Sequence, residues 1–472
     1  MDLINYNFAS NLHCFEQGGM KIVLDVNSGS LHSLDGCAWE VIQQLIAYKG
    51  CWEEVQADLA ARYSAVELAE VLAELTQLAQ EGSLFTTDVT YVRPEFPREP
   101  VVKAICLHVA HDCNLRCEYC FAGTGDFGGD RSLMSLEVGK QAIRFVLEKS
   151  RQRNHCEVDF FGGEPLVNLS VVRELVAYGQ VEAAKLGKTI KFTLTTNAVL
   201  LNQQVREFLA TNDISVVMSL DGRPEVNDKM RPYADGSGSY ATIVKNIQAF
   251  AAENKNSSQY AVGTYYYVRG TYTHHNLDFD LDVLHMADLG IKQISVEPVV
   301  ASPQDQYAFR PEDLPVLMQS YERLADAYLE RQDNSDGFDF FHFNLELGKG
   351  PCLPKRLSGC GAGHEYLAVA PDGSLFPCHQ FVGNPEFKVG DVFSGEIDLE
   401  MAARFRDAHV YNKPECRKCW ARFFCSGGCH AAAFNFNGDL HQPYELGCKL
   451  QRKRLESAMY IKAKQALSQA IS

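Results

Sequence analysis

Residues 113–120 read Cys113-Asn-Leu-Arg-Cys117-Glu-Tyr-Cys120, with three cysteines in eight positions. Thiolates at this spacing can wrap one iron-sulfur cluster, and because the segment offers no fourth cysteine, one iron would remain open to another ligand. Zinc is the alternative for clustered cysteines, but structural zinc sites prefer four ligands in paired Cys-x-x-Cys knuckles. The segment therefore favours a [4Fe-4S] cluster over zinc.

The sequence around this segment alternates strand-like and helix-like runs. Six such pairs lie between residue 101 and about residue 350, and this alternation predicts a parallel sheet flanked by helices. Six pairs, rather than the eight of a closed barrel, favour a partial (β/α)6 barrel of the α/β class. The predicted strands are Ala104–Ala110, Glu157–Phe161, Ile190–Thr196, Ile214–Leu220, Gln259–Val268 and Ile291–Val300. The predicted helices include Leu136–Lys149, Val171–Leu186 and Ile243–Glu253.

Polar or glycine-containing segments follow the second, third and fourth predicted strands. They read Gly162-Gly163-Glu164-Pro165, Thr195-Thr196-Asn197 and Ser219-Leu220-Asp221-Gly222. Chemistry in such barrels lies at the carboxyl ends of the strands, and glycine lets a ligand approach the backbone closely. Any one segment could be an ordinary turn, but with the cysteine segment they make four in order after four successive strands. We therefore expect one shared site, with Glu297 late in the sixth strand as a weaker candidate.

An aromatic residue, Tyr119, precedes the last cysteine of the 113–120 segment. The pattern C-x3-C-x2-C with an aromatic at this position resembles the signature of the radical S-adenosylmethionine (SAM) enzymes. The resemblance implies that Cys113, Cys117 and Cys120 hold a [4Fe-4S] cluster that cleaves SAM, with the protein supplying position and electrostatics.

The same resemblance extends to the segments after the next three strands. The glycines Gly162 and Gly163 look like part of the segment that receives the amino group of SAM, with Glu164 as its polar contact. Contacts with the ribose or carboxylate of SAM are implied for Thr196, Asn197, Ser219 and Asp221.

A second cysteine group lies between residues 352 and 448 and holds eight of the chain's 16 cysteines. Seven of them follow the pattern of the SPASM extension found on peptide-modifying radical SAM enzymes, a resemblance that implies two auxiliary [4Fe-4S] clusters. The first would be held by Cys360, Cys378 and Cys429, with Cys352 as a possible fourth ligand. The second would be held by Cys416, Cys419, Cys425 and Cys448. A zinc ribbon remains possible for the second quartet alone, but it leaves the distant partners unexplained.

The first 90 residues differ in character from the barrel. Two strand-like runs, Met20–Val26 and Ser30–Leu34, precede three amphipathic helical patterns that begin near Gly36, Cys51 and Ala65, an order similar to a winged helix. Three basic residues against thirteen acidic ones give this segment a net charge of −10, which disfavours DNA. Capture of a peptide by strand addition is the better functional hypothesis, and a purely structural cap is the alternative.

Composition narrows the possible partners and compartment. The chain has 44 basic and 60 acidic residues, a net charge of −16, so nucleic acid is an improbable partner. Neither a secretory signal nor an apolar run of membrane-spanning length is evident, so we expect a cytoplasmic protein without a membrane partner. Thiols stay reduced in that compartment, which favours metal ligation over disulfides. The scattered Cys14, Cys37, Cys51, Cys106 and Cys156 are expected to be small buried residues.

We expect four parts along the chain, because prolines at 94, 97 and 100 mark a linker after the first. These are a winged-helix-like precursor-peptide recognition domain over residues 1–92, the radical SAM partial barrel over 93–350, the SPASM domain over 351–450 and a terminal helix over 451–472.

The full layout resembles maturases of ribosomally made peptides. In particular, the runs Ile22–Gly29, Cys120–Gly129 and Asp159–Pro165 look like those of the enzymes that mature six-cysteine (SCIFF) peptides. That resemblance implies thioether formation between cysteine sulfurs and carbon atoms of other residues in a precursor peptide, with three [4Fe-4S] clusters, SAM, and a small flavodoxin or ferredoxin as electron donor. The alternatives are another SPASM-type modification (a carbon-carbon crosslink or a sulfatase-maturase-like side-chain oxidation), a non-enzymatic electron carrier, and a zinc-stabilised binding module.

Overall fold

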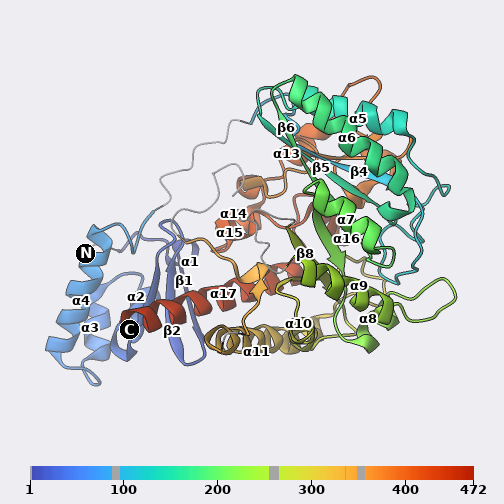
Figure 1. Ribbon diagram of the computed structural model, residues 1–472. Coiled ribbons are helices and arrows are strands. Elements are labelled where there is room, and N and C mark those ends of the chain that lie inside the picture. The colour runs from blue at the N-terminus through green and yellow to red at the C-terminus, as the bar shows by residue number, and fades with distance from the viewer. Residues whose placement is uncertain (1–2, 88–95, 255–264, 335, 348–356, 472) are drawn as a thin grey trace.

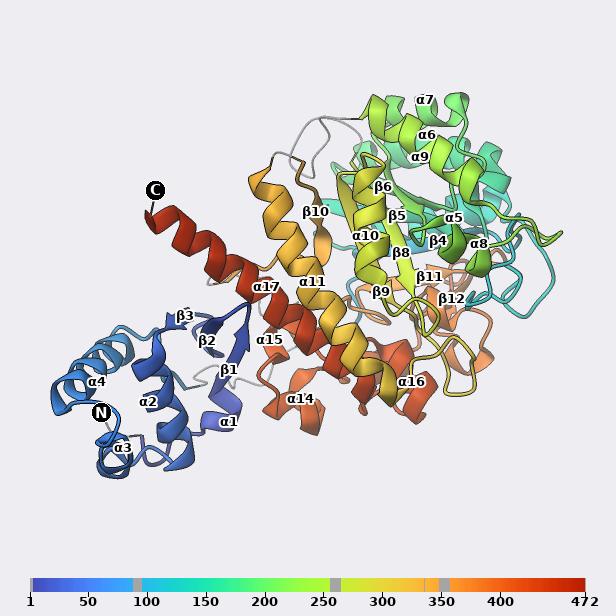
Figure 2. The ribbon, with the colours of Figure 1, turned by 90° about the horizontal axis from the view of Figure 1, so that it is seen from below.

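The computed structural model describes residues 3–87, 96–254, 265–334, 336–347 and 357–471. A large α/β body carries an N-terminal lobe at one side, and a long C-terminal helix runs from the body to that lobe (Figures 1 and 2). Among the described residues, no helix is long and apolar enough to cross a membrane.

Six parallel strands, each paired with the next, form the centre of the α/β body. They are β4 (Ala104–Ala110), β5 (His155–Gly162), β6 (Thr189–Thr196), β7 (Ser215–Ser219), β8 (Tyr266–Tyr272) and β9 (Gln293–Pro298). The sheet ends at the short strand β10 (Asp339–Phe340) on one side and continues from β4 into C-terminal strands on the other, so the described barrel is open. Five of the six predicted strands coincide with these to within a few residues. The fifth, predicted over 259–268, lies partly outside the described residues, and β8 ends four residues later than predicted, at Tyr272.

Helices cover the outer face of the sheet (Figure 1). They are α5 (Leu136–Lys149), α6 (Leu169–Lys185), α7 (Gln203–Thr211), α8 (Pro224–Met230), α9 (Tyr240–Glu253), α10 (Phe279–Asp288) and α11 (Leu314–Asp333), with 3-10 turns over Pro165–Asn168 and Pro311–Asp313. Strand alternation explains the layering. In β5, Val158 and Phe160 are buried in the core shared with the helices, whereas Asp159 and Phe161 face the barrel interior beside a cavity. One face of each strand therefore supports the fold and the other is free to line a site.

The N-terminal lobe contains the two predicted strands and one more. Its antiparallel sheet is β1 (Leu12–Gln17), β2 (Met20–Asp25) and β3 (Leu31–Leu34), preceded by the short α1 (Phe8–Asn11). Helices α2 (Gly36–Ala47), α3 (Trp52–Leu59) and α4 (Ala65–Gln80) pack on it, as the amphipathic patterns predict. The strand β1 was not predicted, because its polar residues do not alternate regularly with apolar ones.

The cysteine-rich region extends the barrel sheet. Strand β11 (Tyr366–Val369) pairs in parallel with β4, and β12 (Ser374–Phe376) and β13 (Gly390–Asp391) follow as an antiparallel meander. The remaining helices are short: α13 (Leu399–Arg406), α14 (Pro414–Lys418), α15 (Arg422–Cys425) and α16 (His430–Asn437), with 3-10 turns over Phe341–Phe343, His379–Phe381, Pro385–Phe387 and Val410–Asn412. This region is therefore fixed to the barrel through β4, the strand that leads into the first cysteine segment.

The terminal helix α17 (Glu445–Ile471) begins six residues earlier than predicted, so Cys448 lies within it. The helix packs along α11 and then reaches all three strands of the N-terminal lobe. At this contact, Nε2 of His13 lies 2.9 Å from Oε1 of Glu456, and the His13 ring stacks on Trp420 with 3.7 Å between ring centroids. The cysteine-rich region and the N-terminal lobe are therefore in direct contact.

Candidate active site

One cavity of about 200 Å³ opens at the carboxyl ends of the barrel strands. It brings together most of the residues that the sequence nominated, from four strand ends. Its lining includes Cys113, Cys117, Tyr119, Cys120, Gly162, Gly163, Thr196, Asn197 and Ser219. Glu297 also lines it, whereas Glu164 and Asp221 lie behind its wall.

The three cysteines of the first segment are half-buried and lie close enough to influence one another's ionisation. Burial raises the pKa of Cys113 to about 12, with the charge of Glu164 adding to the effect, and burial raises the pKa of Cys117 to about 11. Thiolate is the form that binds iron, and a bound metal is what deprotonates such a thiol. The donor set therefore fits a cationic iron centre and is poorly suited to remain as free thiolates.

Glycines allow the end of β5 to pack against the cysteine segment. A Cβ added to Gly163 would lie 2.2 Å from the backbone oxygen of Asp112, and one added to Gly162, whose φ is +131°, would lie 2.2 Å from the oxygen of Ala110. Any larger residue would push the two segments apart. This requirement explains both glycines without invoking a ligand, although the same close packing brings the cavity wall up to Cys113.

The two predicted carboxylate contacts are structural partners of the strand ends. Glu164 is fully buried and accepts hydrogen bonds from the Thr196 hydroxyl at 2.7 Å and the Asn197 amide at 2.8 Å, which ties the end of β5 to that of β6. Asp221, also fully buried, accepts from the Tyr119 hydroxyl at 2.7 Å and the Thr271 amide at 3.0 Å. Direct contact of either carboxylate with SAM stays a prediction.

Arg231 is a site residue that the sequence did not nominate. It is buried, lines the cavity, and donates from Nη1 to the Tyr119 hydroxyl at 2.9 Å, while its Nε has no hydrogen-bond partner. Its charge lowers the pKa of all three thiols of the first segment, against the larger effect of burial. A lone arginine twelve residues after Ser219, at the C-terminal end of α8, carries no local signal that sequence reasoning could have used.

An ion pair borders the cavity on β8 and β9. Arg269 bonds the carboxylate of Glu297. Burial raises the pKa of Glu297, but the charge of Arg269, with help from His342 and Arg454, outweighs burial and holds that pKa at about 2. Glu297 is therefore ionised under all ordinary conditions and serves to fix Arg269.

The first auxiliary cysteines lie next to the barrel. Cys378 and Cys120 pack against the same apolar cluster, which includes Phe127 and Phe381. Burial raises the pKa of Cys378 well above its usual value, and the neighbouring thiols Cys429 and Cys360 raise it further. The predicted partner Cys352 falls outside the described residues. The next residue, His379, lines the barrel cavity, so this group borders the site.

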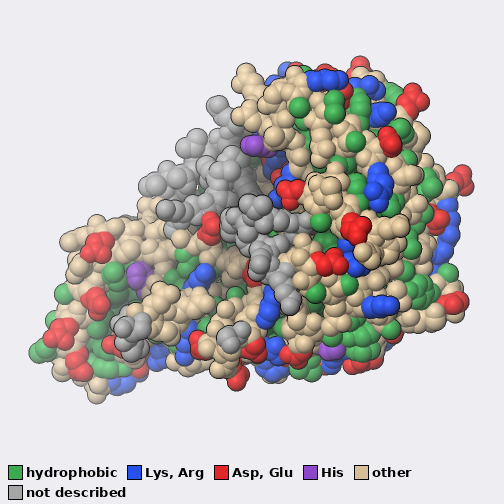
Figure 3. Space-filling view, in the orientation of Figure 1, with side chains coloured by type: hydrophobic (Ala, Val, Ile, Leu, Met, Phe, Trp, Pro, Cys, Tyr) green, Lys and Arg blue, Asp and Glu red, His purple; other side chains and the backbone are tan. Residues whose placement is uncertain are grey.

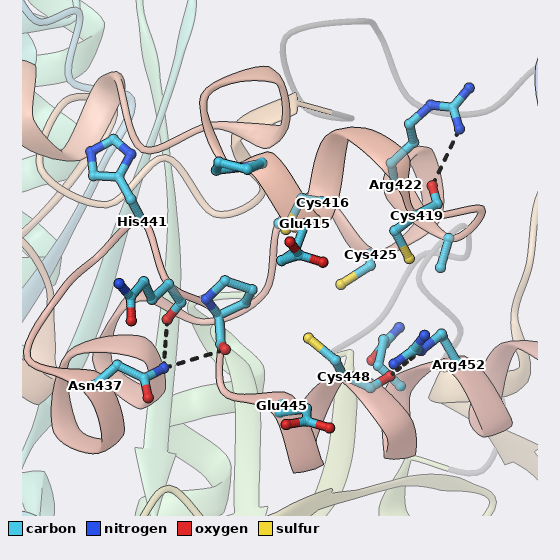
Figure 4. Close-up of a pocket in the computed structure, with 16 residues that line it drawn as sticks. Glu415, Cys416, Cys419, Arg422, Cys425, Asn437, His441, Glu445, Cys448 and Arg452 are labelled. Atoms are coloured by element: carbon cyan, nitrogen blue, oxygen red, sulfur yellow. Dashed lines mark hydrogen bonds between the residues drawn. The ribbon is translucent and has the colours of Figure 1, made fainter. Parts of the chain in front are cut away.

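The second auxiliary cysteines surround a separate, larger cavity of about 690 Å³. Cys416, Cys419 and Cys425 approach it from the α14–α15 segment, and Cys448 approaches from α17. Figure 4 shows their sulfur atoms turned toward a common space. The buried ammonium of Lys413 lies near the thiols of both auxiliary groups and donates to the Gly427 carbonyl at 2.9 Å. This lysine, also missed from sequence, places a positive charge between the two groups.

Every cysteine in the described ranges is free, so these thiols are available as metal ligands. A four-iron cluster is bound by cysteine thiolates. The thiols that face each of the two cavities suit the donor set of such a cluster.

Comparison with known proteins gives a consistent result. Residues 102–245 match a family described as a 4Fe-4S single cluster domain, and residues 360–420 match SPASM, an iron-sulfur cluster-binding domain. A cysteine-type anaerobic sulfatase-maturating enzyme of Clostridium novyi is 26% identical over 339 residues, which cover 67% of this chain and 85% of that protein. The radical SAM cyclopropyl synthase TigE of Paramaledivibacter caminithermalis is 24% identical over 368 residues, 74% of this chain and 72% of TigE.

Among solved structures, that of Streptococcus suis SuiB bound to S-adenosylmethionine covers 93% of this chain and 98% of SuiB, with a TM-score of 0.52 and 16% sequence identity. SuiB is also known bound to its precursor peptide SuiA. At this identity the likeness concerns the fold, whereas the two matched domains concern the cysteine groups themselves. The two matched domains and these relatives together support a radical SAM enzyme that carries a SPASM domain, with SAM and [4Fe-4S] clusters as its cofactors.

Proposed function

We propose that this enzyme is a maturase that forms thioether links between cysteine thiols and carbon atoms of acceptor residues in a ribosomally made precursor peptide. The observation that carries the proposal is an open strand edge beside a groove on the N-terminal lobe. Strand β3 pairs only with β2, so its other edge is unpaired within the described residues. Such an edge can receive an extended peptide as an added strand.

The groove beside β3 has a volume of about 900 Å³. One wall is formed by β3 and α4 and the other by the last turns of α17. Apolar side chains line it on both walls, including Leu75, Leu78 and Leu467. Its ionisable groups are His32, Lys462, Asp35 and Glu74. Acidic side chains gather on the visible face of the same lobe (Figure 3), in keeping with its excess of acidic residues. An amphipathic, extended leader without strong negative charge is the expected occupant.

The likeness in fold to SuiB, which is known bound to a precursor peptide, supports a peptide substrate. We assign recognition of that peptide to the lobe over residues 1–92 because of its open strand edge and the groove beside it.

The barrel residues would position the cofactors rather than react. When bound, the first cluster and SAM supply the oxidant that removes a hydrogen atom from a substrate carbon. Cys113, Cys117 and Cys120 would hold the cluster, and the Tyr119–Arg231 hydrogen bond stiffens the wall beside them. The buried Glu164 keeps two strand ends in register. A flavodoxin or ferredoxin would supply the electron.

A second candidate function is the oxidation of a protein side chain, as in sulfatase maturation, or a carbon-carbon crosslink. The Clostridium novyi relative favours the first and TigE, a cyclopropyl synthase, favours the second. The same cysteines and cavity would serve these reactions, so the substrate decides between them.

Product analysis separates the candidates. Reconstituted enzyme, SAM, a reductant and a cysteine-containing precursor peptide should give a product that has lost two hydrogens and one alkylatable thiol per link. Loss of hydrogens with every thiol still alkylatable would contradict thioether formation and favour the carbon-carbon alternative. Oxidation of a sulfatase-type peptide, with the precursor unchanged, would favour the sulfatase-maturase reading.

A pair of variants tests the lobe in the same assay. Ser33 is exposed on β3 and lies three pairs from the bonded Ser30–Asp25 pair, so by alternation its amide points toward the open edge. Ser33→Pro should remove that donor and weaken peptide binding at least about tenfold, whereas Ser33→Ala should bind as the unmodified enzyme does. Equal binding by both variants would remove β3 from the recognition model.

A further inference from the structure

The barrel contains a second cavity, of about 290 Å³, which lies deeper than the cavity at the strand ends. It shares four lining residues with the cavity at the strand ends, so the two are parts of one lumen. The shared residues are Phe161, Thr195, Arg269 and His379. No residue lining only the deeper part has a role in the cofactor site described above, and this part therefore has space and polar groups for something else.

The position of the deeper cavity places it between the first two cysteine groups. It begins below Gly162 on β5, and Asp159, three residues earlier, lies roughly 10 Å along the strand from that glycine. On the other side it reaches His379, which directly follows Cys378. A substrate side chain in this cavity would lie between the SAM end of the lumen and the first auxiliary group.

Asp159 is the carboxylate that faces this cavity. The groups around it come from every neighbouring element: Cys106 on β4, Glu157 on β5, Lys191 and Thr193 on β6, Tyr267 and Arg269 on β8, Tyr366 on β11, and His379. Burial raises the pKa of Asp159 to about 7, the charge of Glu157 raises it too, and a hydrogen bond from Thr193 opposes them. Lys191 and Arg269 line the same cavity, but their positive charges do not lower the pKa of Asp159 to its usual value.

The other carboxylate of the lumen is poorly matched to a thiol. A cysteine thiol has a pKa near 8.5, so transfer of its proton to Asp159 is uphill by about 1.5 pH units. The charge of Arg269 holds the pKa of Glu297 at about 2, so transfer to Glu297 would be uphill by about 6.5 pH units. Proton acceptors work best when their pKa lies near the working pH.

We propose that the deeper cavity holds the reacting cysteine side chain of the substrate and that Asp159 accepts its proton. The S–H bond breaks, the proton moves to a carboxylate oxygen of Asp159, and the electron pair stays on sulfur, so no oxidant or reductant is consumed. The product of this step is a thiolate, the form that is nucleophilic and a soft ligand. The inference rests on the proposed thioether function, since it requires a thiol substrate.

The test compares Asp159→Asn, Asp159→Glu and the unmodified holoenzyme with a cysteine-containing precursor. At pH 7 the Asn variant should form crosslinks at least about 100-fold more slowly, as expected for loss of a general base, and should recover as the pH approaches the thiol's own pKa near 8.5. The Glu variant should retain much of the rate. SAM cleavage and hydrogen removal from the substrate carbon, followed with a deuterated acceptor, should persist in the Asn variant.

Glu157→Gln provides a matched control on the same strand. Glu157 is exposed and does not line the cavity, but its charge raises the pKa of Asp159. The Gln variant should therefore crosslink at a normal plateau rate, with the acid limb of its pH profile moved to lower pH. An infrared difference titration, unmodified minus Asp159→Asn, should also show one carboxyl titrating near pH 7, a readout that does not depend on turnover.

The outcomes separate the inference from the proposed function. An unmodified enzyme that forms no thioether overturns the function. A crosslinking enzyme whose Asp159→Asn variant keeps the normal rate at pH 7 overturns only the inference. If the Asn variant loses iron or unfolds, the Glu157→Gln profile decides, and an unmoved acid limb would overturn the inference. With a folded Asn variant, an infrared difference carboxyl that titrates near pH 4 would overturn it too.

Discussion

The cysteine site of the barrel and the second auxiliary site are stabilised in different ways. Around Cys113, Cys117 and Cys120, strand ends are joined by buried hydrogen bonds such as those of Glu164 and Asp221, and an apolar core lies behind them. Around Cys416 and Cys448, the elements are short turns and helix ends that border a cavity of about 690 Å³. We therefore expect the barrel to hold its site without the cluster and the auxiliary region to depend on its metal.

The largest expected effect is on catalysis and not on stability. Replacing Cys113, Cys117 and Cys120 together by alanine should abolish SAM cleavage, because no thiolate remains to hold the first cluster. Iron content should fall by about a third of the twelve expected for three four-iron clusters. The unfolding temperature should change little, since β4 and the core persist. Cleavage that survives, or zinc in place of iron, would contradict the radical SAM assignment of these cysteines.

The opposite outcome is expected in the auxiliary region. Cys448→Ala should release the second cluster and lower the unfolding midpoint by about 5 °C or more, because a cluster held by these cysteines would link α17 to the α14–α15 segment. The matched control is Cys156→Ala, a buried barrel cysteine away from every cysteine group, which should lose no iron. If Cys448→Ala keeps its iron and its midpoint, the auxiliary region does not need its metal and the contrast fails.

The barrel could be predicted from the sequence because its elements repeat a local pattern. The helix Leu136–Lys149 and the strand Ala104–Ala110 have the bounds that alternation predicts. Features that depend on contacts between distant parts of the chain could not be predicted. The pairing of β11 with β4 has no local signature, and the early start of α17 is hidden by Gly447 and Cys448, which resemble a loop. Arg231 and Lys413 matter because of what surrounds them in space, and nothing in their neighbouring residues indicates it.

A smaller effect should follow from Glu164→Gln, which probes the hydrogen bonds of the barrel site. Burial raises the pKa of Glu164 from 4.5 to about 7, so its ionised form is disfavoured in the folded state. Stability should therefore fall as the pH rises from about 4.5 to 7, since the unfolded chain gives up this proton first. The Gln variant should lack this part of the pH dependence, measured by thermal unfolding of the two proteins between pH 4.5 and 8. An identical pH dependence in the two proteins would show that ionisation of Glu164 does not destabilise the folded state.

The smallest expected effect concerns the contact that joins the N-terminal lobe to the auxiliary region. His13→Ala removes the ring stacked on Trp420 and the bond to Glu456, and should cost about 1 kcal/mol. Because His13 lies on β1, two strands from the peptide groove, peptide binding should persist while hydrogen exchange of β1 quickens. The control Glu16→Ala alters an exposed residue of the same strand. If His13→Ala also lowered the turnover rate of the enzyme with bound peptide, catalysis would depend on how the lobe is placed against the cysteine-rich region. Peptide capture would then not be the only role of the lobe.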